Sequence, residues 1–160
     1  RVAEVWRLGM LKAVVVDIDG TLSDSRAREH LAQNKEWDKF HAACELDPPF
    51  HDVAGVLRRL DGAYTLVGCT GRPETQRNKT RGWLRRHKIP LDYLLMRREN
   101  DYRPDNTIKP ERVFDWHRSV CTNDQSVTEH VSFVLEDRDK VVQRWRELGY
   151  NCWQVRLGGY

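Results

Sequence analysis

The sequence lacks the features that would assign it to several large classes of protein. None of its apolar runs approaches the roughly 18 residues of a membrane-spanning helix, so we expect no contact with a membrane. Its four cysteines form no Cys-x-x-Cys pair of the kind found in zinc sites, and we expect reduced thiols in a cytoplasmic protein. The six histidines show no metal-ligand spacing, and we assign them no role. A Gly-x-x-x-x-Gly-Lys-Ser/Thr loop is also absent, which excludes a P-loop kinase within these 160 residues.

The composition that remains is that of an ordinary globular domain. The chain is 39% hydrophobic and 32% charged, and 160 residues are enough to bury one core. We therefore expect one domain over residues 11–160, preceded by a linker or N-terminal tail at residues 1–10. The net charge of +3 is mild, although basic residues cluster at 58–59, 85–88 and 97–98. Such clusters suit either solvated helix faces or an anionic polymer as substrate.

Short β-branched runs alternate with helical patterns along the chain. Strands are predicted at 12–17, 64–69, 131–135 and 152–155, with a weaker one at 93–96. Helices are predicted at 53–60, 73–87, 111–116 and 140–148, the last ended by Gly149. This alternation predicts an α/β fold with an open, mostly parallel, Rossmann-like sheet and helices on both faces. Residues from about 23 to 50 carry no strand signal and are predicted to form a small helical insert after the first strand.

Polar residues follow three of the predicted strands. Residues 17–21 (Asp-Ile-Asp-Gly-Thr) follow the first strand, 70–72 (Thr-Gly-Arg) the second and 136–138 (Glu-Asp-Arg) the one that begins at Val131. In open parallel sheets, ligands bind outside the carboxyl ends of the strands. The sequence therefore predicts a single site built from these three segments.

Asp17 and Asp19 are the first candidates for chemistry. Paired acids either bind a hard cation or divide the roles of nucleophile and acid/base between them. The plainer alternative is an Asp-Gly turn with solvated carboxylates. A calcium EF-hand is excluded, because it needs Gly at its sixth position and Glu at its twelfth, whereas Gly20 is fourth and Arg28 twelfth.

Four motifs in order resemble the haloacid dehalogenase superfamily of phosphotransferases over residues 14–155. They are residues 17–21, residues 67–72 around Thr70, Lys109 in Ile-Lys-Pro, and the acidic pair Glu136 and Asp137. The resemblance implies that Asp17 is a nucleophile forming an aspartyl-phosphate and that Asp19 is the acid/base. It further implies phosphate binding by four other residues, namely Thr21, Thr70, Gly71 and Lys109.

The resemblance also implies Mg²⁺ as the cofactor. The expected metal ligands are Asp17, the backbone carbonyl of Asp19, and Asp137, with Glu136 as the outer acid of the pair. Similar proteins carry Asp-Asp where this chain has Glu136 and Asp137. The division of metal binding within the pair therefore stays open.

Less general features are similar to the 3′-phosphatase domain of phage polynucleotide kinase-phosphatases. They comprise residues 95–100, Asp105 four positions before Lys109, Arg138, and residues 152–155. This similarity implies that Arg28, Arg72 and Asp105 engage phosphate or hold the lysine. It also implies DNA or RNA 3′ ends as substrate, and a kinase domain upstream in the same polypeptide as a possible partner.

Two other functions stay open at this stage. One is a phosphatase of mononucleotides or other small phosphoesters, because no residue in the sequence indicates which base or sugar the enzyme recognises. The other is a receiver-like signalling module, although receivers place the phosphorylated Asp mid-chain rather than after the first strand. Trp37 and Phe40 could stack on a terminal base, but their helical spacing is more typical of core residues.

Overall fold

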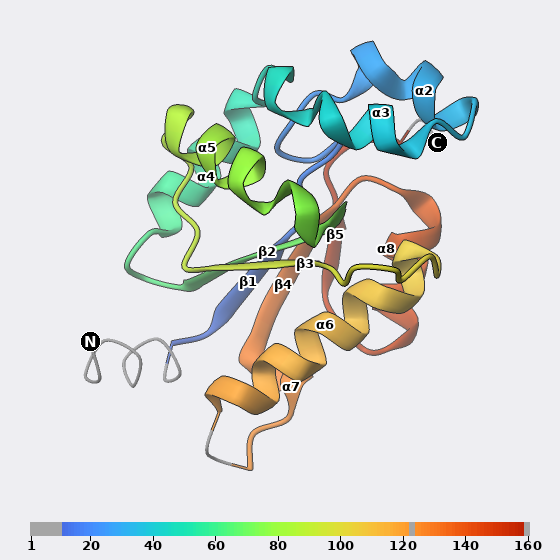
Figure 1. The fold of residues 1–160 in the computed structure, drawn as a ribbon. Helices are drawn as coiled ribbons and strands as arrows, with labels where there is room; N and C mark the ends of the chain where they lie inside the picture. Colours follow the sequence, from blue (N-terminus) through green and yellow to red (C-terminus); the bar gives the residue numbers. More distant parts are fainter. Residues whose placement is uncertain (1–10, 122–123, 159–160) are drawn as a thin grey trace.

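Five parallel strands form one open sheet in the computed structural model, which describes residues 11–121 and 124–158 (Figure 1). The order across the sheet is β3-β2-β1-β4-β5. The predicted α/β fold with a parallel sheet is thus confirmed. The expected tail at residues 1–10 lies outside the described residues. The strands are β1 (Ala13–Val16), β2 (Thr65–Pro73), β3 (Tyr93–Arg97), β4 (Val131–Glu136) and β5 (Cys152–Gln154).

Helices cover both faces of the sheet because the central strand is apolar on both sides. All four residues of β1 are fully buried, and they alternate between two cores. Val14 and Val16 pack with α4 (His51–Leu60) and α5 (Arg77–Arg86). Ala13 and Val15 pack with α6 (Asp105–Val120) and α8 (Asp139–Glu147), while the short α7 (Val127–His130) leads into β4.

Three element boundaries near the carboxyl ends of the strands differ from the sequence-based expectation. β2 does not end at residue 69 but continues to Pro73, with a break in its register against β3 after Cys69. The helix expected to begin at residue 73 starts only after the 3₁₀ turn η3 (Glu74–Gln76). The helix expected at 111–116 is the 16-residue α6, which begins at Asp105 and contains Pro110. Asp105 and Lys109 therefore lie one turn apart on the same helix.

The predicted helical insert lies between β1 and α4, beside the carboxyl ends of the strands (Figure 1). Within it, Phe40 is buried, whereas Trp37 is 47% exposed and packs edge-on against Phe40. The insert consists of η1 (Arg26–Arg28), α2 (Glu29–Gln33), α3 (Trp37–Ala42) and η2 (Cys44–Leu46).

All four cysteines are free thiols, as expected. Within the described ranges, no helix is both long and apolar enough to cross a membrane.

Candidate active site

A cleft of about 940 Å³ opens at the carboxyl ends of the strands. Asp17 and Asp19 lie in its wall, together with Gly71 and Arg138. Residues 35–41 of the insert, Pro73, Thr75 and residues 97–105 complete the lining. The cleft therefore lies where the three polar segments of the sequence were expected to meet.

Lys109 bridges two acids beneath this cleft. Its Nζ donates to Asp17 Oδ1 at 2.6 Å and to Glu136 Oε2 at 2.7 Å, and all three side chains are buried. The backbone amides of Asp137 and Arg138 also donate to Glu136 Oε1, at 3.2 and 3.4 Å. Both carboxylate oxygens of Glu136 are thus occupied by donors, whereas Asp17 Oδ2 is buried with no hydrogen-bond partner among the described residues.

Asp17, Glu136 and Asp137 form an acidic cluster that could hold a metal ion. One carboxylate oxygen from each lies within 4.8 Å of those of the other two. Burial and the neighbouring carboxylates raise the pKa of Asp17 to about 7 and the pKa of Asp137 to about 9. A bound cation would reverse this effect, because its charge favours the ionised carboxylates. The crowding of three buried acids around one lysine fits a divalent cation.

Gly20 permits Asp137 to approach the loop after β1. A Cβ atom at Gly20 would lie 2.1 Å from Asp137 Oδ2, and its φ of +89° is a conformation that side chains disfavour. Thr21, which is fully buried, points its Oγ1 at Asp137 Oδ1, 3.4 Å away. The Asp-Gly-Thr end of the first motif therefore contacts the acid that directly follows β4 rather than forming a free turn.

Asp19 lies in a different environment from Asp17, although the two are separated by one residue. Arg72 Nη2 donates to Asp19 Oδ1 at 2.6 Å, and Arg28 forms a further short ion pair with the same oxygen. Burial opposes ionisation of Asp19, but the charges of Arg72 and Arg28 prevail and hold its pKa well below the usual range. Asp19 is a carboxylate in this state.

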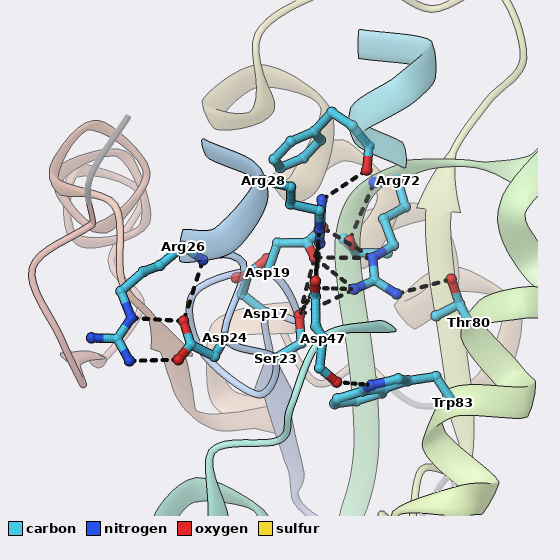
Figure 2. Close-up of polar contacts among 12 residues, drawn as sticks. Asp17, Asp19, Ser23, Asp24, Arg26, Arg28, Asp47, Arg72, Thr80 and Trp83 are labelled. Atoms are coloured by element: carbon cyan, nitrogen blue, oxygen red, sulfur yellow. Dashed lines mark hydrogen bonds and ion pairs between the residues drawn. The ribbon is translucent and has the colours of Figure 1, made fainter. Parts of the chain in front are cut away.

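Asp47 completes this network and balances its charge, as Figure 2 shows. Arg28 donates to Asp47 through Nε at 2.9 Å and Nη2 at 2.6 Å. Ser23 Oγ lies 3.0 Å from Asp47 Oδ2, and the backbone carbonyl of Asp47 accepts from Trp83 Nε1 at 2.7 Å. Two buried guanidinium groups thus meet two carboxylates, which satisfies the requirement that buried charges be paired.

Asp105 occupies a third polar cluster at the start of α6. It pairs with Arg97 and Arg138, and Arg97 Nε also donates to the carbonyl of Gly71 at 2.9 Å. A Cβ at Gly71 would lie 2.4 Å from Asp105, so only glycine allows this approach. Burial acts against ionisation of Asp105, but Arg138, Lys109 and Arg97 lower its pKa to about 2.

Thr70 lies within β2, directly after the break in its register with β3 and directly before Gly71, which lines the cleft. Its Oγ1 accepts a hydrogen bond from the backbone N–H of Arg72 at 3.2 Å, and the side chain is buried. The hydroxyl hydrogen stays available to another acceptor.

Comparison with known proteins places this site in a family. The pattern of the polynucleotide kinase PNKP phosphatase domain, a haloacid dehalogenase type, matches residues 11–160. The chain belongs to this family. It is therefore a phosphatase. The resemblance to haloacid dehalogenase phosphatases and to polynucleotide kinase-phosphatases, drawn from the sequence motifs, is confirmed.

Solved structures agree with the PNKP phosphatase assignment. A chain of the Pnkp1/Rnl/Hen1 RNA repair complex shares 34% identity over 94% of this chain, with a TM-score of 0.76. A second structure of the Pnkp1/Rnl/Hen1 complex gives 35% identity, 94% coverage and a TM-score of 0.75. The chain spans only 44% and 48% of these two relatives. A haloacid dehalogenase-like hydrolase from Streptococcus pneumoniae, at 12% identity, matches 90% of this chain and 84% of its own with a TM-score of 0.61, which shows the shared fold.

The structure brings the predicted residues into three neighbouring groups rather than one. The acidic cluster with Lys109 and Thr21 is the first, Asp19 with Arg28 and Arg72 the second, and Asp105 with Gly71 the third. Asp105 makes its hydrogen bonds to Arg97 and Arg138, not to Lys109. The catalytic and phosphate-binding roles of all these residues stay predictions.

Sequence reasoning missed the residues that hold the predicted ones in place. Asp47 and Ser23 pair with the two arginines of the second group, and Thr80 Oγ1 accepts from Arg72 Nη1 at 3.2 Å. Asp47 is distinguished by its burial in the loop before Pro48 and Pro49. Burial in a loop leaves no pattern in the sequence, so no signal pointed to Asp47.

Removal of Asp47 should destabilise the domain. Asp47→Ala leaves Arg28 and Arg72 in excess over the single carboxylate of Asp19, and we expect a loss of about 3 kcal/mol in the free energy of unfolding, measured with urea. Asp24→Ala is the control, because it breaks an ion pair with Arg26, whose side chain is 73% exposed. Equal effects of the two substitutions would contradict the proposed importance of the buried network.

Binding of Mg²⁺ should strengthen as the pH rises. The raised pKa values of Asp17, about 7, and Asp137, about 9, mean that the metal-free folded state holds protons that the unfolded chain has released. The stability of the metal-free protein therefore falls as the pH rises above about 4. At higher pH, Asp17 and Asp137 carry fewer protons, so Mg²⁺ has fewer protons to displace when it binds. We expect the increase in melting temperature caused by Mg²⁺ to grow from pH 6 to pH 9.

Two variants check the source of this dependence. Asp137→Asn should remove most of the Mg²⁺ response, whereas Asp115→Asn, in an exposed pair with Arg98, should retain it. A response to Mg²⁺ that does not vary with pH would show that the ion binds elsewhere.

Proposed function

We propose that the chain is a Mg²⁺-dependent phosphomonoesterase that works through an aspartyl-phosphate and removes phosphate from the 3′ ends of polynucleotides. The observation that carries this proposal is the environment of Asp17. Its Oδ1 is held by Lys109, and its Oδ2 is buried without a partner in the described part of the chain. An oriented carboxylate with one unengaged oxygen is suited to attack phosphorus.

Asp17 and Asp19 divide the reaction between them. A carboxylate oxygen of Asp17 forms a bond to phosphorus as the bond from phosphorus to the ester oxygen breaks, and Asp19 supplies the proton to that oxygen. Water then attacks the acyl phosphate while Asp19 takes up a proton, and inorganic phosphate leaves. Lys109 neutralises the negative charge that builds up beside Asp17.

Arg28 and Arg72 link the arrival of substrate to the protonation of Asp19. While both guanidinium groups contact Asp19, they keep it ionised. A phosphate dianion in the cleft attracts the same two groups, because bidentate pairing with phosphate suits arginine. This competition weakens their hold on Asp19 and raises its pKa, as a general acid requires.

Asp17 and Asp137 are the residues best placed to hold Mg²⁺. Both oxygens of Glu136 accept from nitrogen donors, so Glu136 supports Lys109 rather than binding the ion. The backbone carbonyl of Asp19 remains the predicted third protein ligand. A bound Mg²⁺ would offset the charge of the carboxylates and of the phosphate oxygens.

The shape of the cleft supports a polymer as substrate. The insert contributes only short helices, and the cleft of about 940 Å³ is larger than a phosphate ester alone requires. One of the two similar Pnkp1 complexes is named for RNA repair, which favours a nucleic-acid end over a metabolite. The kinase domain expected upstream in the same polypeptide also stays a prediction, supported by the family's name.

The substrate is tested by comparing three phosphate esters. We expect Mg²⁺-dependent phosphate release from a 3′-phosphorylated oligonucleotide, little from its 5′-phosphorylated isomer, slower release from a 3′-mononucleotide, and none in EDTA. Asp17→Asn should abolish release by removing the nucleophile. Preference for the 5′ isomer or for the mononucleotide would overturn the proposed 3′-end substrate, and an active Asp17→Asn enzyme would overturn the mechanism.

Trp37 should contribute to binding of a polymer end. It lines the cleft, is 47% exposed and stacks on His41 at 6.3 Å between ring centroids. Because stacking of a base on an aromatic ring contributes about 1–3 kcal/mol, Trp37→Ala should raise KM for the oligonucleotide roughly tenfold. KM for p-nitrophenyl phosphate should not change.

Trp153→Ala is the matched control for Trp37→Ala. Trp153 is similarly exposed, at 52%, but it stacks on Phe133 and does not line the cleft. A rise in KM for both substrates in Trp37→Ala, or an equal rise in Trp153→Ala, would show that Trp37 has only a structural role.

A further inference from the structure

A second cluster of potential metal ligands lies at the opposite end of the sheet from the cleft. His117 is in the last turn of α6, Cys121 directly follows that helix, and His130 is the last residue of α7. Figure 1 shows α7 and the end of α6 at the bottom of the molecule, away from α2 and α3. These residues contribute nothing to the phosphatase site described above.

The ligand atoms of the three residues are close to the spacing of a metal site. Cys121 Sγ lies 3.0 Å from His130 Nδ1, and one ligand atom from each of the three residues lies within 4.8 Å of the others. In a tetrahedral zinc site with bonds of about 2.0–2.3 Å, ligand atoms are about 3.3–3.8 Å apart. Side-chain rotations of about an ångström would bring the three ligands to those distances.

The orientation of His130 resembles that of a metal ligand. Its Nε2 lies 2.9 Å from the backbone carbonyl of Leu11, which can only accept, so Nε2 carries the hydrogen. The lone pair is therefore on Nδ1, which faces Cys121. Histidines that bind metals commonly donate their other ring nitrogen to a carbonyl in this way. Trp116 stacks on the ring, with centroids 5.4 Å apart and planes at 17°, and limits its rotation.

His117 supplies an independent indication of a missing ligand. Its side chain is only 7% exposed, and its Nε2 is buried without a hydrogen-bond partner among residues 11–121 and 124–158. Its ring centroid is 5.2 Å from that of His130. A buried polar atom left unpaired destabilises a protein, and a bound ion would avoid this cost.

We propose that His117, Cys121 and His130 bind a zinc ion, with water at the fourth coordination position. Two imidazoles and a thiolate are the ligand types that favour Zn²⁺ over Mg²⁺, so the two metal sites would not compete for the same ion. The zinc would connect the end of α6, the end of α7 and the segment that precedes β1. The expectation that the histidines have no role is revised accordingly. Their spacing gave no signal because His117 and His130 come from two different helices.

Cobalt substitution tests this site without relying on enzyme activity. The full chain, freed of metal, is titrated with Co²⁺ in excess Mg²⁺, which occupies the acidic cluster. We expect one equivalent of Co²⁺ to produce the near-ultraviolet sulfur-to-cobalt charge-transfer band, and one equivalent of Zn²⁺ to remove it. Cys121→Ser should lose the band completely, and His117→Ala should weaken Co²⁺ binding at least tenfold.

Cys152→Ala is the control, because Cys152 is a buried thiol in β5 outside the cluster. It should keep the band, and Cys121→Ser should keep its circular dichroism spectrum and its phosphatase activity. Zn²⁺ should raise the melting temperature of the unsubstituted chain but not of Cys121→Ser. Absence of the band, or its persistence in Cys121→Ser, would overturn the proposal and leave a hydrogen-bonded thiol and imidazole pair.

Discussion

The ion pairs of Lys109 connect most of the structure around the candidate active site. The lysine comes from α6, whereas its partners Asp17 and Glu136 come from the ends of β1 and β4. A buried ammonium group is costly unless it is paired, so the position of α6 against the sheet is tied to these two carboxylates. Since neighbouring parallel strands end at the same edge, the fold itself supplies both partners.

Positive and negative side chains at this edge of the sheet are distributed unequally around Asp17 and Asp19, although only one residue separates the two aspartates. Around Asp17 there are three clustered carboxylates, with Lys109 bonded to two of them, which favours a further cation. Around Asp19 there are two carboxylates and two guanidinium groups, which need none. The pKa of Asp17 is accordingly raised and that of Asp19 lowered. Different environments of this kind allow two identical side chains to take different roles.

The sequence was sufficient for the parts of the fold that follow from periodicity. Valine-rich runs located the strands, and polar residues after them located the site, because both signals are local. The start of α6 was not predictable in this way, since the helical pattern covered only residues 111–116, and tertiary contacts of Asp105 and Lys109 accompany the earlier start of the helix. Asp47 was missed for a related reason, since its partners Arg28 and Ser23 lie 19 and 24 residues away in the sequence and share no pattern with it.

The length of α6 connects the two ends of the domain. Its 16 residues span about 24 Å, with Lys109 in the second turn and His117 in the last complete turn. The first of these side chains is fixed by the acids at the carboxyl ends of the strands, and the second lies in the cluster near their amino ends. An ion bound at His117 would restrain the end of α6 near the amino ends of the strands, whereas the ion pairs of Lys109 restrain its beginning near their carboxyl ends. Because the two restraints act on different turns of one helix, loss of the ion would leave the ion pairs of Lys109, and with them the active site, intact.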